Sequence, residues 1–310
     1  MPRPLRWFRW LPLVLLLLGT AAAQTLHFAA FGDMGTGDIG QRAIARQMEI
    51  QNEKQHWSFA LMLGDNIYDR GSPQDFDRKF RSVYRNLRQA GVVFHATLGN
   101  HDMLDPAGRN GMVQVEDDDF GYVGHSDEYV FEAGPLVAGK VLARFICLDS
   151  PVWLGALEKD KKQLDARMAR LRAWLAESNR AHWNFLYMHH PMYSYTVSGG
   201  MALMTLRHGH GPEDALRAMI EPVIKGKIDV VLAGHEHFYQ KIRPQEGIHY
   251  FISGGGGRVR RGALFRHPQV EFAAEVLHFM DFELTSSELH YTAISNRGLV
   301  IHSGVITRAD

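Results

Sequence analysis

Residues 26–35 have the sequence LHFAAFGDMG, in which a mostly apolar run is followed at once by a polar, glycine-containing turn. A short apolar run that ends at glycine is typical of a buried β-strand. The same arrangement recurs in residues 59–68, FALMLGDNIY, and in residues 92–102, VVFHATLGNHD. Each run is followed by a residue that carries a carboxylate or an amide. The pattern predicts a sheet whose strands end in polar loops.

Short apolar runs alternate with helical patterns through most of the chain, and strand-like runs follow to its end. This alternation predicts the α/β class, with two packed, mixed β-sheets flanked by helices. One expected helix, residues 73–88, has aromatic side chains four residues apart from Phe76 to Tyr84. Only a short connection is expected between Asp149 and the helix near residue 161. The expected strands are 26–31, 59–63, 92–98, 128–133, 141–148, 185–188, 230–233, 248–253, 276–284, 288–294 and 299–306, and the expected helices are 38–54, 73–88, 161–177 and 213–225.

The first 23 residues predict a signal peptide. Arginines near the start, an apolar run from Leu11 to Leu18 and the small residues Ala21–Ala23 form the parts of such a segment. Because the run is short for a membrane span, cleavage is expected, and an uncleaved anchor is the alternative. Residues 24–310 contain no repeat, linker or low-complexity tract, so a single domain is expected. The protein is thus expected to be periplasmic or secreted, without stable membrane insertion after cleavage.

The charge and cysteine content exclude several classes of protein. The 34 basic residues balance the 34 acidic residues, so nothing indicates binding of nucleic acid or of a membrane surface. The single cysteine, Cys147, cannot form an intramolecular disulfide, and the apolar run around it indicates a core position. The chain also contains 17 histidines, whose meaning depends on where they fall.

Polar clusters follow five of the expected strands. In α/β sheets, functional sites lie at the carboxyl ends of strands. Taken singly, a Gly-Asp turn or a histidine pair is usually structural, but five such clusters with oxygen or imidazole groups predict a shared site. The clusters are Gly32-Asp33-Met34-Gly35, Gly64-Asp65-Asn66-Ile67-Tyr68, Gly99-Asn100-His101-Asp102, His189-His190-Pro191 and Gly234-His235-Glu236-His237.

The chemistry of these side chains favours a pair of metal ions. Carboxylate, phenolate, amide and imidazole groups suit hard or borderline divalent and trivalent cations. The set exceeds the roughly four to six ligands that one ion uses, so two ions sharing a carboxylate are expected. Two ions about 3.5–4 Å apart can activate water and hold the attacking and leaving oxygens of a displacement. Phosphate esters are the substrates that most need such charge neutralisation.

Together these motifs resemble the purple acid phosphatases, particularly the small, tartrate-resistant type, within the calcineurin-like metallophosphoesterases. The family pattern is Asp-x-Gly, Gly-Asp-x-x-Tyr, Gly-Asn-His, a His before an aromatic residue or His and Pro, and Gly-His-x-His. All five occur here in order over residues 32–237. Most other dinuclear metallophosphoesterases have Asp-x-His at the first motif and lack the tyrosine of the second. Gly35 and Tyr68 distinguish this chain from them.

The resemblance implies a dinuclear centre of Fe(III) and a second, divalent ion, which is iron, zinc or manganese. Charge transfer from tyrosinate to Fe(III) gives the family its colour. By the resemblance, one aspartate, Asp65, bridges the two ions. The ligands implied for Fe(III) are Asp33, Asp65, Tyr68 and His237, and those implied for the divalent ion are Asp65, Asn100, His189 and His235.

Two further histidines are expected to act on the substrate. The resemblance implies that His101 donates a hydrogen bond to the phosphate or acts as a general acid toward the leaving oxygen. A second such histidine matches His210, within His210-Gly211-Pro212, and His208 is the alternative. His190 is expected beside the site and not among the ligands. The motif residues Asp102 and Glu236 are expected to orient their neighbours.

The expected function is an exported acid phosphatase that hydrolyses phosphate monoesters by attack of a metal-activated hydroxide. The alternatives are a related enzyme acting on phosphodiesters, nucleotides or phosphoproteins, and a non-catalytic metal- or phosphate-binding protein. We expect a small phosphate ester as substrate and a monomeric protein. Arginines 258, 260 and 261 have two interpretations, guidance of an anionic substrate or a solvated basic loop.

Overall fold

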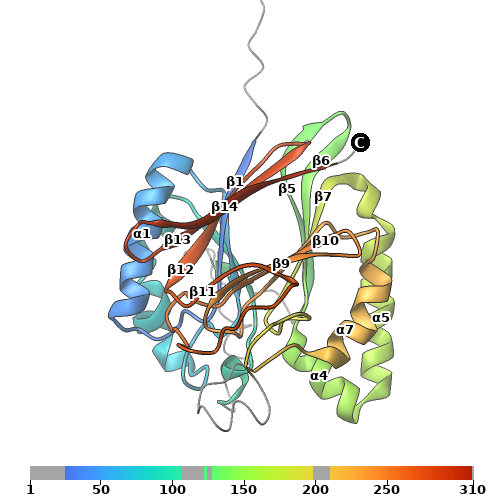
Figure 1. Ribbon diagram of the computed structural model, residues 1–310, viewed down its shortest axis with the longest axis horizontal. Coiled ribbons are helices and arrows are strands. Elements are labelled where there is room, and N and C mark those ends of the chain that lie inside the picture. Colours follow the sequence, from blue (N-terminus) through green and yellow to red (C-terminus); the bar gives the residue numbers. More distant parts are fainter. Residues whose placement is uncertain (1–24, 106–121, 124–127, 198–209, 309–310) are drawn as a thin grey trace, which may run out of the picture.

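The computed structural model describes residues 25–105, 122–123, 128–197 and 210–308. Two mixed β-sheets pack face to face, and helices cover their outer faces (Figure 1). The predicted fold class is therefore confirmed. The expected signal peptide and His208 lie outside the described residues. Within the described ranges, no helix combines the length and the apolar character needed to cross a membrane.

The first sheet has the strand order β14-β13-β12-β1-β2-β3-β4. Strands β1 to β4 run parallel to one another, whereas β12, β13 and β14 continue the sheet antiparallel beyond β1. The parallel strands therefore bring their carboxyl ends to the same edge. The bounds are β1 Leu26–Phe31, β2 Phe59–Leu63, β3 Val93–Thr97, β4 Tyr122–Val123, β12 His278–Leu284, β13 Glu288–Ser295 and β14 Val300–Thr307.

The second sheet has the strand order β11-β9-β10-β8-β7-β6-β5. Its central strands β6, β7, β8 and β10 are parallel, and β5, β9 and β11 are antiparallel to their neighbours. Strands β9 and β11 were not predicted; β9 carries the buried polar residues Gln240 and Lys241 and so lacks an apolar run. The bounds are β5 Tyr129–Val137, β6 Lys140–Cys147, β7 Ala181–Met188, β8 Val230–Ala233, β9 Tyr239–Gln245, β10 Ile248–Ser253 and β11 Val270–Ala274.

Aromatic rings fill the space between the sheets. The ring of Phe28 lies 5.3 Å from that of Phe145 and 5.5 Å from that of Phe185, edge to face in both cases. Such contacts add to the stabilisation that burial of the rings provides. Cys147 is buried, as its sequence context predicted. The core thus joins the two sheets directly and fixes the strand ends relative to one another.

Helix α1, Ile39–Gln55, covers the outer face of the first sheet (Figure 1). It begins where the Asp38 carboxylate accepts a hydrogen bond of 3.1 Å from the backbone N–H of Gln41, as N-cap residues do. Its buried side includes Ile44 and Met48, as predicted. The second sheet is covered by α4, Ser150–Lys159, α5, Lys161–Ala176, and α7, Asp214–Ile224, and two short 3-10 turns are η3, His101–Met103, and η5, Ser178–Arg180.

The predicted single helix at 73–88 was wrong. The segment contains the 3-10 turn η1, Pro73–Asp75, the π-helical turn η2, Asp77–Arg81, and the short helix α2, Arg85–Gln89. The backbone carbonyl of Lys79 accepts a hydrogen bond of 2.6 Å from the Gln41 side chain. Because this carbonyl is engaged from outside the segment, the regular helical ladder is interrupted there. The aromatic residues nevertheless remain buried on one side, as their spacing predicted.

The short connection expected after Asp149 was also wrong, because helix α4 occupies it. Asp149 is the N-cap of α4 and accepts a hydrogen bond of 3.3 Å from the N–H of Val152. Pro151 lies in the first turn, where no backbone donor is needed. Trp153 and Ala156 bury one side of the helix. Tertiary packing thus made a helix of a segment that has little helical periodicity.

Candidate metal centre

The carboxyl ends of three neighbouring parallel strands position Asp33, Asp65 and Asn100. Their loops are tied together by backbone hydrogen bonds. The N–H of Asp33 donates to the carbonyl of Gly64 at 3.0 Å, and the N–H of His101 donates to the Asp65 carboxylate at 2.9 Å. The order β1-β2-β3 in the sheet therefore places three oxygen-bearing side chains side by side.

Backbone strain is concentrated in this centre. Asp33, Asp65 and His235 have φ values of 57°, 51° and 68°. Residues other than glycine rarely occupy this left-handed region, which costs of order 1–3 kcal/mol each. Three separate loops thus accept an unfavourable backbone conformation at the residues whose side chains converge. Strain of this kind is common at functional sites.

Glycines beside these residues allow the loops to approach closely. A Cβ atom on Gly64, where φ is 87°, would lie 2.5 Å from Nδ1 of His189. A Cβ on Gly99 would lie 2.2 Å from the backbone nitrogen of Asp65. At Gly35 the nearest atom would be the carbonyl oxygen of Asn66 at 1.9 Å. The position that sequence analysis singled out therefore has no room for any side chain, because the loop carrying Tyr68 passes against it.

One group of side chains consists of Asp33, Tyr68 and His237. The phenol oxygen of Tyr68 lies 3.1 Å from Oδ1 of Asp33 and 3.0 Å from Nε2 of His237. Nε2 of His237 is 3.4 Å from the same carboxylate oxygen. These residues come from three loops, 204 positions apart at the extremes (237 − 33 = 204). The structure therefore brings together the side chains that the motifs predicted for the first ion.

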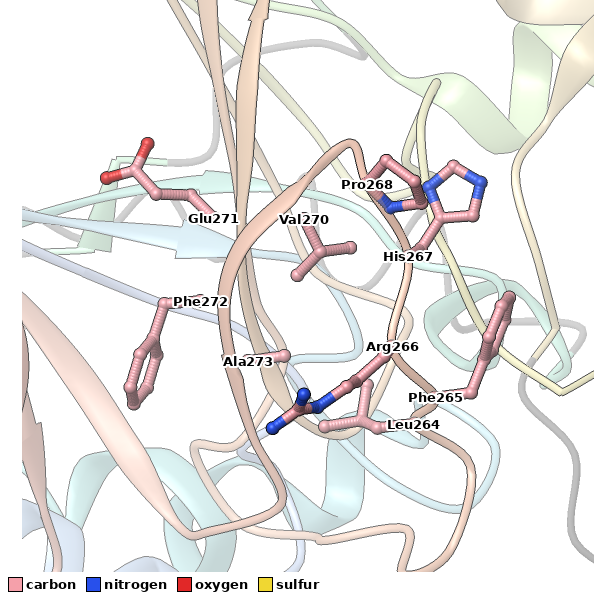
Figure 2. Close-up of a pocket in the computed structure, with 9 residues that line it drawn as sticks. All are labelled: Leu264, Phe265, Arg266, His267, Pro268, Val270, Glu271, Phe272 and Ala273. Atoms are coloured by element: carbon pink, nitrogen blue, oxygen red, sulfur yellow. The ribbon is translucent and has the colours of Figure 1, made fainter.

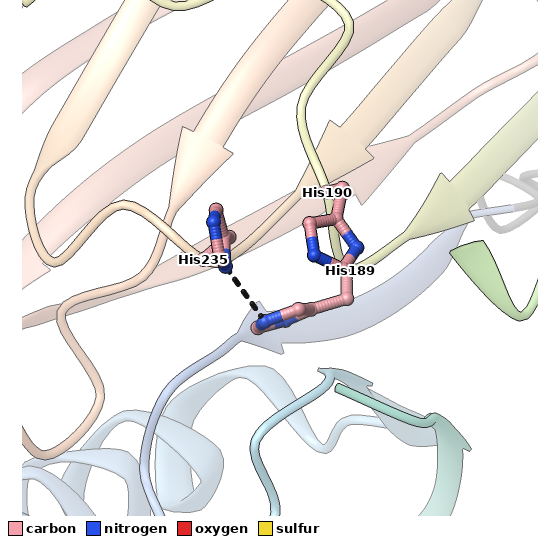
Figure 3. A group of neighbouring side chains, drawn as sticks. All are labelled: His189, His190 and His235. Carbon is pink, nitrogen blue, oxygen red and sulfur yellow. Dashed lines mark hydrogen bonds between the residues drawn. The ribbon is translucent and has the colours of Figure 1, made fainter. Parts of the chain in front are cut away.

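The second group consists of Asn100, His189 and His235. Oδ1 of Asn100 lies 3.1 Å from both Nε2 of His189 and Nδ1 of His235. The two imidazole nitrogens are 3.2 Å apart, which Figure 3 shows as the dashed line. The histidines come from the ends of β7 and β8 in the second sheet, whereas Asn100 comes from the first. The centre is thus built across both sheets.

Asp65 lies between the two groups. Its Oδ1 is 3.5 Å from Nε2 of His189, and oxygen or nitrogen atoms of Asp33, Asp65 and His189 all lie within 4.8 Å of one another. Burial, followed by the charges of Asp33 and Asp65, raises the pKa of Tyr68 in the first group. A single carboxylate therefore lies next to Asp33 of the first group and His189 of the second, which is the position required of a bridging ligand.

The protonation pattern fits a cation at this centre. The Nδ1–H of His189 donates to the carbonyl oxygen of Leu63 at 2.8 Å. A carbonyl only accepts, so in the neutral imidazole the proton is on Nδ1 and Nε2 carries the lone pair. That lone pair faces oxygens of Asn100 and Asp65, which are also acceptors. Several acceptors that converge without a donor are the arrangement that a metal ion satisfies.

The electrostatics of the buried side chains point the same way. Burial, followed by the charges of Asp33 and Asp65, holds the pKa of the Tyr68 phenol well above its ordinary value. Burial is also the main cause that lowers the pKa of His237 to about 4 and that of His235 well below its ordinary value. Both imidazoles are therefore neutral at neutral pH and available as ligands, and ionisation of the phenol requires a nearby cation.

His190 lies against this centre, as expected from the sequence. Its ring centroid is 4.4 Å from that of His235, and its Nδ1 lies 2.9 Å from the hydroxyl oxygen of Ser150 (Figure 3). Ligand atoms of His189, His190 and His235 all lie within 4.8 Å of one another. The contact with Ser150 occupies one nitrogen of His190 and fixes its ring beside His235.

The two histidines expected to face the substrate both border the centre. The Nδ1 of His101 lies 2.6 Å from the carbonyl oxygen of Asp69, and its ring centroid is 4.6 Å from that of Tyr68. The ring centroid of His210 is 4.2 Å from that of His235. The structure thus places one histidine next to each group of candidate ligands.

The carboxylates of Asp102 and Glu236 accept hydrogen bonds from the loops that form the centre. The fully buried carboxylate of Asp102 accepts four hydrogen bonds of 2.9–3.0 Å, from the N–H groups of Asn66, Ile67 and Gly99 and the Asn66 side chain. Glu236, also fully buried, accepts from the N–H of Gly211 at 2.7 Å. Both carboxylates therefore position backbone next to predicted site residues, as expected for their places in the motifs.

Two of the three arginines whose role the sequence left open, Arg258 and Arg260, contact residues of the centre. The Gly254–Gly257 turn packs on the first motif, where the N–H of Gly256 donates to the carbonyl of Gly32 at 2.9 Å. Beyond it, the guanidinium carbon of Arg258 lies 3.8 Å from the centroid of the Tyr68 ring, and Arg258 pairs with Asp69 at 2.5 Å. A nitrogen of the Arg260 guanidinium lies 2.7 Å from Nε2 of His210. In the sequence, the glycine run Gly254–Gly257 directly before these arginines is the feature that could have located them near the centre.

A separate cavity of about 870 Å³ is lined by strand β11 and the segment that precedes it (Figure 2). Its lining includes none of the predicted metal ligands and neither His101 nor His210. The cavity and the polar centre are therefore distinct features of the molecule. The lining residues are Leu264, Phe265, Arg266, His267, Pro268, Val270, Glu271, Phe272 and Ala273.

Comparisons of sequence find phosphatases. The family model described as calcineurin-like phosphoesterase matches residues 26–239. Purple acid phosphatase 4 of Arabidopsis thaliana is 24% identical over an alignment that covers 90% of this chain and 82% of that protein. Tartrate-resistant acid phosphatase type 5 of Mus musculus is 26% identical, with 80% of this chain and 76% of that protein covered. The match to the family model spans all five polar motifs.

Comparisons of structure support the fold alone. The structure titled GAP50, the anchor in the inner membrane complex of Plasmodium, has a TM-score of 0.79 at 19% identity, covering 92% of this chain and 90% of that one. Purple acid phosphatase PPD1 from yellow lupin seeds has a TM-score of 0.68 at 18% identity, covering 93% of this chain and 54% of that one. Because an anchor protein shares this architecture, chemistry has to be argued from the side chains of the centre.

Proposed function

Because this chain belongs to the calcineurin-like phosphoesterase family, we propose that it is an exported acid phosphatase of the purple acid phosphatase type. The observation that carries the proposal is the position of Asp65 between two groups of ligands, one of which contains a tyrosine. A phenol beside two carboxylates ionises only next to a strongly charged cation, and Fe(III) is such a cation. The proposed substrate is a small phosphate monoester.

The donor set suits two ions of different character. Asp33, Asp65, Tyr68 and His237 would hold Fe(III), because three of these four groups are anionic oxygen donors when bound. The second ion, iron, zinc or manganese in the divalent state, would be held by Asp65, Asn100, His189 and His235. When bound, the pair supplies Lewis acidity toward the phosphoryl oxygens and activates water at neutral pH.

The protein's own side chains prepare the substrate. With the Nδ1 of His101 held by the carbonyl of Asp69 at 2.6 Å, the Nε2 of this histidine is the nitrogen left for the substrate. We assign it to donate a hydrogen bond to the phosphoryl group or a proton to the leaving oxygen. His210 and Arg260 border the other group of ligands. Positive and hydrogen-bonding groups therefore flank the place where the phosphate would bind.

The cellular location and the oligomeric state that we propose are inferred from the sequence. The arginine-containing, apolar first 23 residues direct export, and the mature protein works in the periplasm or outside the cell as a monomer. The balanced charge gives no reason to propose nucleic acid as a substrate. A non-catalytic binding protein is the second reading, motivated by an anchor protein of the same fold.

The proposed function predicts preference for monoesters. Metal-loaded protein should hydrolyse para-nitrophenyl phosphate at least about tenfold faster, in kcat/KM, than bis-para-nitrophenyl phosphate, because the centre is positively charged when loaded and the monoester carries the larger negative charge. Release of nitrophenolate measures both rates. Equal rates would favour the diesterase alternative, and no release from either substrate by fully loaded protein would favour the binding protein.

Replacing Tyr68 by phenylalanine should abolish any visible absorption band while the protein stays folded. The substitution removes only the phenol oxygen, which contacts Asp33 and His237, and keeps the buried ring. Its effect on the free energy of unfolding should be within about 1 kcal/mol. The measurement is a visible spectrum of iron-loaded protein with circular dichroism as a check of folding.

Tyr84→Phe provides the matched control for this experiment. Tyr84 is also fully buried, and its hydroxyl contacts the Gln41 side chain at 3.2 Å, outside the metal centre. This variant should keep the band of the wild type. A Tyr68→Phe protein that remains coloured would show that Tyr68 is not the iron ligand.

A further inference from the structure

Arg260 is joined to both sides of the centre by hydrogen bonds. Its backbone N–H donates to the carbonyl oxygen of His237 at 2.9 Å, and its guanidinium lies 2.7 Å from Nε2 of His210. The ring of His210 in turn lies 4.2 Å from that of His235. Arg260 thus reaches the rim of the centre from the loop after the glycine run, next to both histidines of the last motif.

The hydrogen bond between Arg260 and His210 has only one direction. A guanidinium carries five N–H donors and no acceptor, so the Nε2 of His210 must be the acceptor. In this arrangement the proton of the neutral imidazole is on Nδ1. Nε2 of His210 therefore has no proton to give to a leaving group while it contacts Arg260. The sequence predicted that His210 acts on the substrate and left the role of Arg260 open. The arrangement in the structure favours the opposite assignment.

We propose that Arg260 binds the phosphate group of the substrate and that His210 is a positioning residue that orients the guanidinium. The proposal rests on the phosphatase function proposed above. A planar guanidinium suits phosphate because it donates two parallel N–H bonds to two oxygens. The bond to His210 engages one of its donors and fixes the plane of the group. Arg260 would then hold the non-reacting oxygens of the ester.

The support for His210 is itself built into the fold. The N–H of Gly211 donates to the Glu236 carboxylate at 2.7 Å, and the hydroxyl of Ser194 donates to the same oxygen at 3.2 Å. Glu236 is fully buried between the two histidines of its motif. The chain Glu236, Gly211, His210 therefore connects the last motif to the guanidinium of Arg260. A group that only capped a solvated loop would not need a buried anchor.

Arg258 is less suited to the same role. Its guanidinium is paired with the Asp69 carboxylate at 2.5 Å, so that a negative charge offsets its own. Its guanidinium carbon also lies 3.8 Å from the centroid of the Tyr68 ring. The guanidinium of Arg260 lies 2.7 Å from Nε2 of His210, whose ring is 4.2 Å from that of His235. The choice of Arg260 thus follows from its place beside the second group of candidate ligands.

Binding of inorganic phosphate to the metal-loaded protein tests the proposal without requiring turnover. Isothermal titration calorimetry on the full chain should show Arg260→Ala weakening the phosphate Kd about tenfold or more, because a charge-assisted hydrogen bond is lost. Arg261→Ala is the matched control, since it removes the same charge from an exposed neighbour in the same loop. This control should change Kd by less than about twofold.

A double-mutant cycle tests the role of His210. His210→Leu should weaken phosphate binding in the wild-type background but have little further effect in Arg260→Ala, because its contribution passes through Arg260. His210→Gln should retain most of the affinity, since its amide oxygen can accept the arginine N–H but the amide cannot act as an acid. With alkyl and aryl phosphates, the His210 variants should change KM much more than kcat.

Three results would overturn the proposal. Equal phosphate Kd values for Arg260→Ala and Arg261→Ala would remove Arg260 from the binding site, as would a metal-loaded wild type that binds no phosphate. A His210→Gln protein that binds phosphate normally but loses kcat mainly with alkyl phosphates would make His210 the general acid. If the wild type binds phosphate through Arg260 yet hydrolyses no ester, the inference survives and the proposed phosphatase function fails.

Discussion

Asp65→Ala should lower kcat/KM for para-nitrophenyl phosphate by about a thousandfold or more and should reduce the metal content below two ions per chain. Asp65 lies next to members of both ligand groups, with Oδ1 3.5 Å from Nε2 of His189 and ligand atoms of Asp33, Asp65 and His189 all within 4.8 Å of one another. Its loss removes the group shared by the two ions. The two ions supply several kcal/mol of charge stabilisation to the transition state, which corresponds to at least a thousandfold in rate. Nitrophenolate release and elemental analysis measure the two effects.

The same variant should be about as stable as the wild type when both are free of metal. Burial is the main cause that raises the pKa of Asp33 and Asp102, and the negative charge of Asp65 raises both further, so the three buried carboxyl groups repel one another. Removing one relieves that repulsion. Urea unfolding in the presence of a chelator should therefore give an unfolding free energy close to that of the wild type, because this relief offsets the loss of the hydrogen bond from the His101 N–H.

Asp77→Ala serves as the control for Asp65→Ala. The Asp77 side chain is 76% exposed and pairs only with Arg81 on the surface among its described contacts, so activity, metal content and stability should stay near those of the wild type. An Asp65→Ala protein with full metal content and activity would contradict the bridging role. An Asp65→Ala protein that has lost activity because it is unfolded would contradict the stability prediction alone.

Asp102→Ala should lower the free energy of unfolding by about 3 kcal/mol. The Asp102 carboxylate is fully buried and accepts from Asn66, Ile67 and Gly99, and its removal leaves their three backbone N–H groups without this acceptor, whereas the Asn66 side chain keeps its bond to the carbonyl of Thr97. Each unsatisfied donor costs of order 1 kcal/mol or more of stability. Removing Asp102 also removes the cost of burying its charge, which offsets part of this loss. Urea unfolding of metal-free protein measures the loss, and it should exceed that of any surface variant.

Asp102→Ala should also lower turnover more than about tenfold in the protein that remains folded. Asn66 and Ile67 lie between Asp65 and Tyr68, and Gly99 precedes Asn100, so the released loops carry three predicted ligands. Asp281→Ala is the matched control, because Asp281 is a buried aspartate that accepts from Trp57 and Gln51 far from the centre in sequence. That variant should lose stability but keep turnover per folded molecule.

The Asn variant separates charge from hydrogen bonding at position 102. Asp102→Asn keeps one acceptor oxygen and should have an intermediate loss of stability, because at least one donor then faces an amide NH₂ group. Equal stability of Asp102→Ala and the wild type would show that water or loop movement satisfies the donors. Full turnover in Asp102→Ala would show that the loops keep their positions without the carboxylate.

The amino-acid sequence determined the architecture and the family. Apolar runs such as Leu26–Phe31 and Val230–Ala233 were predicted with the bounds that the structure has, because burial on both faces requires an unbroken apolar segment. The motifs after those runs were sufficient to predict the resemblance to purple acid phosphatases, which the matched relatives confirm. These features are local, and a reader of the sequence needs no coordinates to see them.

Other features depended on contacts between residues far apart in the chain. Helix 73–88 is broken because Gln41 takes a carbonyl 38 positions away, and β9 was missed because its buried Lys241 and Gln240 resemble exposed residues in a sequence. Sequence rules weigh near neighbours only, so they cannot detect a partner supplied by another element.

The same reason limits what could be known of the centre. The motifs predicted which side chains meet, since parallel strands bring their ends to one edge. The position of Asp65 between two groups, the four donors on Asp102 and the pairing of Arg260 with His210 were decided by tertiary structure alone. Residue types specify what each group can donate or accept, but only packing of the two sheets decides which groups lie within 3 Å or so of one another.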